Sequence, residues 1–157
     1  MPSTPLLSKL KADFSHLHFR ISESFRWSPE EQTVYYNIGD AHGDGLLLHE
    51  VAHGLLKHRQ YSRDIELISI ETEAWTKART LAAAYGVALN EDTIQDHLDT
   101  YRDWLHARSR CPQCEATGLQ TQRSQYRCLA CGHHWRVNEA RVCALRRYGL
   151  SNQKTSA

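Results

Sequence analysis

Long apolar runs and early cysteines are both missing from this 157-residue chain. No stretch approaches the roughly 18 consecutive apolar residues that a membrane-spanning helix needs. The N-terminus lacks the long apolar segment of a secretory signal peptide. The first 110 residues contain no cysteine, so disulfides do not organise this part of the chain. We therefore expect a soluble, cytoplasmic protein with no membrane partner.

The formal net charge of +1 conceals two segments of opposite sign. Residues 1–106 contain 10 Lys and Arg against 16 Asp and Glu, a net charge of −6. Residues 107–148 contain 8 Arg against 2 Glu, a net charge of +6. This asymmetry favours two modules with different partners. The basic segment is compatible with nucleic-acid binding, and also with a small metal module that is basic for no functional reason.

All five cysteines lie in the basic segment, and four of them form two C-x-x-C pairs. Thirteen residues separate Cys111 and Cys114 from Cys128 and Cys131. This spacing is typical of two knuckles that close a tetrahedral zinc site. A redox pair is the weaker alternative because no βαβ pattern surrounds the cysteines. We expect Cys143 to be a small apolar residue rather than a ligand.

The sequence LLLHEVAHGLLKH, residues 46–58, contains three histidines and a glutamate among leucines. On a helix with 3.6 residues per turn, His49 and His53 lie within about 40° of each other, where they can bind one zinc ion. Glu50 lies about 100° round the helix from His49, beside the metal rather than on it. This H-E-x-x-H pattern predicts a zinc site in which Glu50 is the general base that activates water.

The third histidine of this stretch, His58, needs a separate explanation. If the helix continues through LLKH, His58 lies about 180° from His49 and about 140° from His53. It then cannot share their metal, and a position on the surface or behind the ligands is favoured. Only a break in the helix, for which Gly54 is a candidate, would change this.

A catalytic zinc usually has three protein ligands, so one more residue is needed. A helix predicted over residues 65–85 and ended by Gly86 offers two glutamates. Glu71 lies about 40° from the centre of the apolar stripe of this helix, and Glu73 lies about 120° away on its flank. A carboxylate directed at the core is costly unless it is paired or bound to metal, which favours Glu71. The alternative is that the helix starts later and both glutamates are solvated first-turn residues.

Periodicity and turn signals predict the remaining elements. The N-terminal segment forms a short helix that runs into a strand containing Phe19 and Ile21, and QTVYYNI forms the next strand. A glycine-rich loop follows, and the helix with the H-E-x-x-H motif starts near Leu46. A third long helix is capped by Asn90. HHWRV forms a strand that closes the cysteine module, and residues 138–150 form a final short helix.

The H-E-x-x-H helix, followed in the next predicted helix by ETEAWTKA, resembles the compact gluzincin metallopeptidases, especially the ImmA/IrrE-like group. In that family the second helix carries E-x-x-A-[DN], and its first glutamate is a zinc ligand. The matching positions here are Glu71 and Ala74, so the resemblance implies Glu71 as the third ligand. Trp75 stands where the family prefers Asp or Asn, which removes a partner able to orient a ligand. The resemblance covers residues 30–86.

The same resemblance implies a role for the strand that precedes the active helix. In this class that strand commonly pairs with an extended substrate, and QTVYYN is positioned to do so. Tyr35 or Tyr36 is then a candidate to polarise a carbonyl oxygen. The simpler interpretation, that each tyrosine packs a half-buried strand, is favoured for each one individually.

The cysteine module has a second resemblance. YRCLACG, residues 126–132, is similar to the zinc ribbon of SprT-like proteases, which act on DNA-associated proteins. Those proteins take a third histidine from a later H-G-containing motif, which is missing between His58 and Cys111. His97 and His106 are too isolated to replace it. The chain is therefore similar to SprT-like proteases in its domain architecture more than in the ligands of its predicted catalytic site.

Arginines and aromatic residues interleave in the ribbon: Arg110, Arg123, Arg127 and Arg136 with Tyr126 and Trp135. This mixture suits single-stranded nucleic acid or a phosphate backbone. The alternatives are a ribbon that only packs on the peptidase domain and a ribbon that docks a protein substrate.

Together these patterns predict an α+β protein with a small zincin-like domain over residues 1–106, a zinc ribbon over residues 107–140, and a short helix with a flexible tail over residues 141–157. The expected activity is zinc-dependent peptide hydrolysis with two zinc ions, one catalytic and one structural. The expected ligands are His49, His53 and Glu71 for the first, and Cys111, Cys114, Cys128 and Cys131 for the second. The partner is a protein or peptide substrate, either general or a single regulatory protein such as a repressor, with nucleic acid on the ribbon. The alternative functions are a non-catalytic zinc protein that binds nucleic acid or has a regulatory role, and a SprT-like protease that acts on DNA-associated proteins.

Overall fold

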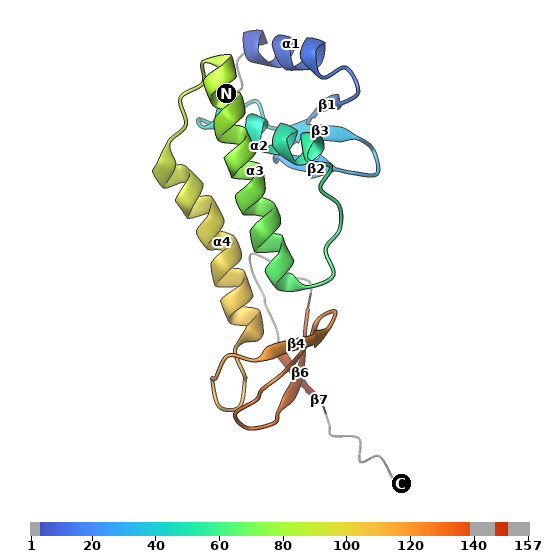
Figure 1. Ribbon diagram of the computed structural model, residues 1–157, viewed down its shortest axis with the longest axis vertical. Coiled ribbons are helices and arrows are strands. Elements are labelled where there is room, and N and C mark those ends of the chain that lie inside the picture. Colours follow the sequence, from blue (N-terminus) through green and yellow to red (C-terminus); the bar gives the residue numbers. More distant parts are fainter. Residues whose placement is uncertain (1–3, 139–146, 151–157) are drawn as a thin grey trace. The chain divides into compact units, whose positions relative to one another are not determined.

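The computed structural model describes residues 4–138 and 147–150 (Figure 1). Within these ranges the chain forms four helices and two small sheets, so the expected α+β class is confirmed. No helix among these residues is long and apolar enough to cross a membrane.

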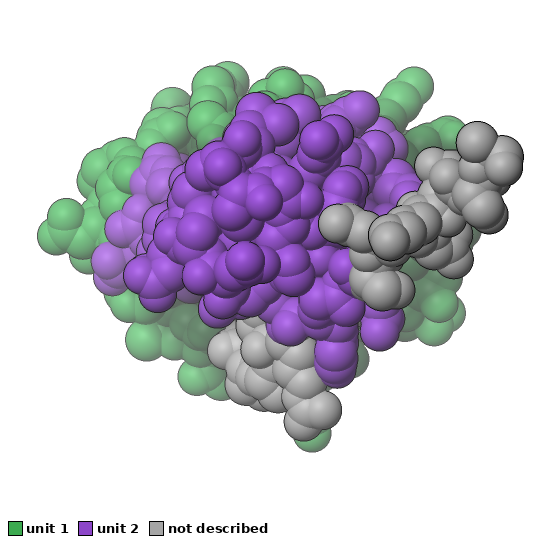
Figure 2. Space-filling model, turned by 90° about the horizontal axis from the view of Figure 1, so that it is seen from below, with its two compact units in different colours: residues 1–60, 69–95 green, residues 61–68, 96–157 purple. Residues whose placement is uncertain are grey.

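Two compact units make up the chain (Figure 2). The first comprises Met1–Gln60 and Ser69–Gln95, and the second comprises Tyr61–Ile68 and Asp96–Ala157. The cysteine module lies in the second unit. That unit also includes the start of one helix and most of another, both of which were predicted to belong to the first domain.

The first unit contains a three-stranded sheet and the helix with the H-E-x-x-H motif. Helix α1 (Thr4–Asp13) precedes β1 (His18–Ile21), β2 (Arg26–Ser28), β3 (Thr33–Tyr36) and α2 (Gly43–Leu55). Strand β2 was not predicted, because three residues are too few to show an alternating pattern. Helix α2 packs against β2 and β3 and is buried along almost its whole length. It begins three residues before the predicted Leu46.

Strand β3 lies in the centre of the sheet, in the order β1-β3-β2. It pairs in parallel with β1 and antiparallel with β2, so both of its hydrogen-bonding edges are taken. The implied pairing of QTVYYN with an extended substrate is therefore wrong. Only β1 and β2 offer an edge in this sheet.

Helix α2 ends earlier than the sequence indicates. The backbone N–H of His58 donates to His53 O at 3.0 Å, and that of Lys57 donates to Gly54 O at 3.2 Å. Lys57 has a left-handed φ of 57°. These features define a Schellman motif, with lysine at the position where glycine is usual. The expected helical continuation through LLKH is therefore wrong, and the chain turns back on itself at His58.

The two long helices were predicted closely. Helix α3 (Asp64–Tyr85) is followed by Gly86, which has a φ of 68° and so provides the left-handed residue after a helix end. Helix α4 (Glu91–Ser109) begins after Asn90, whose side-chain Oδ1 accepts a hydrogen bond from the backbone N–H of Thr93 at 3.2 Å.

The second unit contains a four-stranded antiparallel sheet in the order β4-β5-β6-β7. The strands are β4 (Leu119–Gln122), β5 (Gln125–Arg127), β6 (His134–Val137) and β7 (Arg147–Leu150). The predicted helix over residues 138–150 is wrong at its C-terminal end, because β7 pairs with β6 there. Residues 139–146 of that predicted helix, including Cys143, lie outside the described residues.

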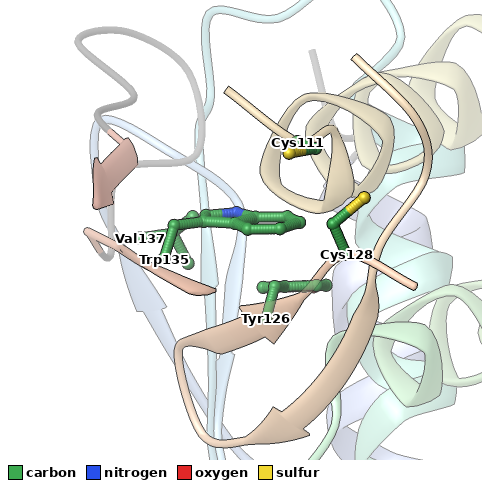
Figure 3. Close-up of a cluster of buried hydrophobic side chains, with 5 residues drawn as sticks. All are labelled: Cys111, Tyr126, Cys128, Trp135 and Val137. Atoms are coloured by element: carbon green, nitrogen blue, oxygen red, sulfur yellow. The ribbon is translucent and has the colours of Figure 1, made fainter. Parts of the chain in front are cut away.

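Five side chains form a small core in this unit: Cys111, Tyr126, Cys128, Trp135 and Val137 (Figure 3). The rings of Tyr126 and Trp135 stack with an interplanar angle of 13°. Both rings are almost fully buried. They cannot stack on nucleic-acid bases, so this part of the expected interface is wrong.

A buried ion pair accompanies the core of the second unit. Arg108 Nε donates to Asp64 Oδ2 at 2.8 Å, and these side chains are 2% and 5% exposed. The Tyr126 hydroxyl also donates to Asp64. The Trp135 indole N–H donates to Arg108 O at 2.9 Å, and the Arg108 guanidinium lies 4.7 Å from the Trp104 ring centroid. The polar groups of Tyr126 and Trp135 thus find their hydrogen-bond partners at the start of α3 and the end of α4, not within the ribbon.

Candidate metal centres

The first candidate site lies in the first unit, between α2 and α3. His49 Nε2 lies 2.9 Å from Glu71 Oε2 and 3.1 Å from His53 Nε2. His53 Nε2 lies 3.4 Å from Glu71 Oε1. All three residues are buried. The structure thus brings together the two histidines of H-E-x-x-H and the glutamate that the stripe geometry favoured.

These separations fit a zinc ion. Zinc binds imidazole nitrogen and carboxylate oxygen at roughly 2.1 Å, so tetrahedral ligand atoms lie about 3.4 Å apart. Two imidazole nitrogens 3.1 Å apart also repel each other unless a proton or a cation lies between them. The donor set of two nitrogens and one carboxylate is typical of a catalytic zinc, because it leaves a coordination position open.

The charges around this site favour a cation. Burial acts to raise the pKa of Glu71, but its contacts with His49 and His53 outweigh burial and hold this pKa well below its usual range. Burial lowers the pKa of His53, but the contact with Glu71 and the charges of Glu50 and Glu71 raise it above 6.5 overall. Two buried carboxylates therefore act on these imidazoles, and a metal ion would replace the proton that they attract.

Glu50 and Glu73 differ in their surroundings. Glu50 is buried on α2, directly after His49 in the sequence, and its charge contributes to the raised pKa of His53. The Glu73 side chain is 64% exposed and contacts His58 rather than the ligand atoms. Glu71, not Glu73, completes the cluster.

Trp75 provides a packing surface beside the first candidate site. Its ring stacks on that of His49, with centroids 4.2 Å apart and an interplanar angle of 28°. The indole is 1% exposed, so it restricts the orientation of the His49 ring by contact. Trp75 also lines a cavity of about 400 Å³ beside the first turn of α2.

The contacts of the two tyrosines of β3 do not support a catalytic role. The Tyr35 hydroxyl donates to Glu31, and its ring lies under the Arg26 guanidinium at 4.2 Å. Tyr36 is 6% exposed and belongs to the core. Both observations support the simpler interpretation that these residues pack the strand.

The second candidate site consists of the four cysteines of the second unit. The sulfur atoms of Cys111 and Cys131 lie 3.7 Å apart, and those of Cys114 and Cys128 lie 3.4 Å apart. A tetrahedral zinc with bonds of roughly 2.3 Å to sulfur places its ligands about 3.8 Å apart. The arrangement therefore fits a closed, structural zinc site of the ribbon type.

Backbone amides prepare one of these thiols for metal binding. The N–H of Cys131 is the largest cause that lowers the pKa of Cys128, to about 7, with further contributions from Cys114 and the N–H of Ala130. Burial acts in the opposite direction. At this pKa about half of the thiol is thiolate at neutral pH, and the thiolate is the form that binds zinc.

Comparison with protein-family models, with curated proteins and with solved structures found no match. Any assignment of function therefore depends on the structure itself, above all on the two candidate metal-binding clusters.

Two further residues make contacts that the sequence did not identify. His58 contacts His53 because the chain turns back after α2, and no glycine at residue 57 signals that turn. Tyr148 lies on β7, in a segment that was predicted to be helical. An alternating pattern over four residues is too short to have identified that strand.

Proposed function

We propose that this protein is a zinc-dependent metallopeptidase. The observation that carries the proposal is the meeting of His49, His53 and Glu71 in one buried cluster, with Glu50 next to a ligand on the same helix. When bound, zinc would polarise the substrate carbonyl and increase the acidity of water. The proposal includes a zincin-like fold for the first unit and a relationship to the ImmA/IrrE-like metallopeptidases.

The side chains of the cluster have separate roles. His49, His53 and Glu71 hold the metal, and Glu71 also lowers the net charge of the site. Glu50 accepts a proton from the attacking water and returns it to the leaving amine. Trp75 keeps the His49 ring in place. The four cysteines hold a second zinc that stabilises the ribbon and does no chemistry.

Metal analysis tests both sites at once. The wild-type protein is expected to contain two zinc ions per chain, and His49→Ala and Cys111→Ser are each expected to contain one. The physical reason is that each variant removes a ligand from only one cluster. Elemental analysis after dialysis against a weak chelator gives the count. A single ion in all three proteins would contradict the assignment of two sites.

A second candidate function, nucleic-acid binding, is favoured by one face of the four-stranded sheet. Strand register and alternation place the following side chains on the face opposite Tyr126 and Trp135: Leu119, Gln122, Gln125, Arg127, His134, Arg136, Tyr148 and Leu150. None of these residues is acidic. Tyr148 is 38% exposed, and the Arg136 guanidinium lies 4.7 Å from its ring centroid. An exposed aromatic ring beside arginines is a surface on which single-stranded nucleic acid can stack.

Variants of this face test the second function. Tyr148→Ala is expected to weaken binding of a single-stranded oligonucleotide by about 5–150-fold, because it removes a stacking partner worth roughly 1–3 kcal/mol. Changing both Arg127 and Arg136 to Gln is expected to reduce the slope of log K against log salt by about 1.4, because two phosphate contacts are lost. Fluorescence anisotropy at several salt concentrations measures both. Arg20→Gln, on β1, is the control, and equal binding by all variants would exclude this face.

A further inference from the structure

Three side chains in contact, those of His53, His58 and Glu73, connect the first candidate metal site with solvent. His53 Nδ1 lies 2.9 Å from His58 Nδ1, and His58 Nε2 lies 3.1 Å from Glu73 Oε2. The exposed fraction of these side chains rises from 8% for His53 to 11% for His58 and 64% for Glu73. His58 therefore connects a buried metal ligand to a solvated carboxylate.

The backbone holds His58 in this position without help from a metal. The Schellman motif at the end of α2 ties the His58 N–H to His53 O. The Trp27 indole N–H donates to His58 O at 3.2 Å. Trp27 in turn packs against Gly54, where an added Cβ would lie 3.1 Å from the indole ring. Any larger residue at 54 would press on the ring that anchors His58.

The contacts among His53, His58 and Glu73 allow a single arrangement of protons once His53 binds a metal. His53 Nε2 must then offer its lone pair to the metal, so its N–H is on Nδ1. His58 Nδ1 must accept this hydrogen bond, so the N–H of His58 is on Nε2 and donates to Glu73. Because a carboxylate only accepts, Glu73 favours the same direction from the other end.

We propose that His58 and Glu73 are positioning residues that hold His53 in the ring orientation and tautomer required for metal binding. A partner of this kind also increases the basicity of the ligand. The inference rests on the metal centre of the proposed function, and it does not require peptide hydrolysis.

Zinc affinity tests this role directly. His58→Phe keeps a ring but has no acceptor, and it is expected to weaken zinc binding at the first site by about 10–100-fold. His58→Asn places Oδ1 near the former Nδ1 position, so it is expected to recover most of this loss. Competition with a chromophoric zinc chelator measures the affinity. The binding step that is missing from the titration of His49→Ala is the one that belongs to the first site. His16→Phe, an exposed histidine in the turn after α1, is the matched control.

A double-variant cycle separates positioning from simple packing. Glu73→Ala is expected to weaken zinc binding by a few-fold in the wild type, and to have no effect when His58 is Phe, because its contact with His53 passes through His58. Equal affinity of His58→Phe and wild type, or an equal loss in the Phe and Asn variants, would overturn the proposal. If His49→Ala leaves the zinc content unchanged, the metal centre itself is wrong, which is a different result from loss of the His58 effect alone.

Discussion

Glu50→Gln is expected to reduce the rate of peptide hydrolysis by about 10²–10⁴-fold, the usual contribution of a general base. Glutamine has nearly the shape of glutamate but cannot accept a proton from water. Both zinc ions are expected to remain, because Glu50 is not one of the clustered ligands. Hydrolysis should be measured on candidate protein substrates as well as on casein, since an enzyme restricted to one partner would leave casein intact.

Glu23→Gln is the matched control for this experiment. Glu23 is an exposed residue between β1 and β2, and the same change of charge there should leave the rate unaltered. Retained hydrolysis in Glu50→Gln would contradict the base assignment. Hydrolysis that is undetectable even in the wild type, combined with salt-dependent nucleic-acid binding, would favour the regulatory function instead.

Arg108→Met is expected to destabilise the second unit by about 3–5 kcal/mol, because it leaves the carboxylate of Asp64 buried without its cation. Methionine retains an apolar stem of similar length, although it loses the guanidinium that lies over the Trp104 ring. The main effect is therefore the loss of charge and not of volume. Urea unfolding followed by tryptophan fluorescence measures the change.

A second substitution distinguishes an unpaired charge from general damage to the core. Asp64→Asn in the Arg108→Met background removes the buried negative charge and keeps an oxygen that can accept from the Tyr126 hydroxyl. The double variant is expected to recover a large part of the lost stability. A double variant less stable than Arg108→Met would show that Arg108 acts through its other contacts, such as that with Asn138 O.

Features that depend on neighbours along the chain were predictable. The spacing of His49 and His53 on α2, the helical stripe that favours Glu71, the cap at Asn90 and the two C-x-x-C knuckles all result from local geometry. Each depends on the regular geometry of one helix or one tight loop, where backbone sterics leave few conformations. The α+β class and the candidate ligand residues therefore follow from the order of residues along the chain, whereas their assembly into two clusters depends on tertiary packing.

Features that depend on partners distant in the chain could not be predicted in this way. β3 is a central strand because β1 and β2 pair with its two edges, and a strand pattern does not identify those partners. Residues 147–150 are a strand because they pair with β6, although their composition is compatible with a helix.

His58 shows the same limit at the metal site. LLKH has good helix formers and no glycine at the turn, so local preference extends α2 through His58. The chain instead turns at Lys57, and contacts of His58 with Trp27, 31 residues earlier in the chain, and with Glu73 accompany that turn. Local spacing thus identifies the candidate ligands, whereas packing between distant segments determines that they meet and that His58 contacts His53, because only folding brings those segments together.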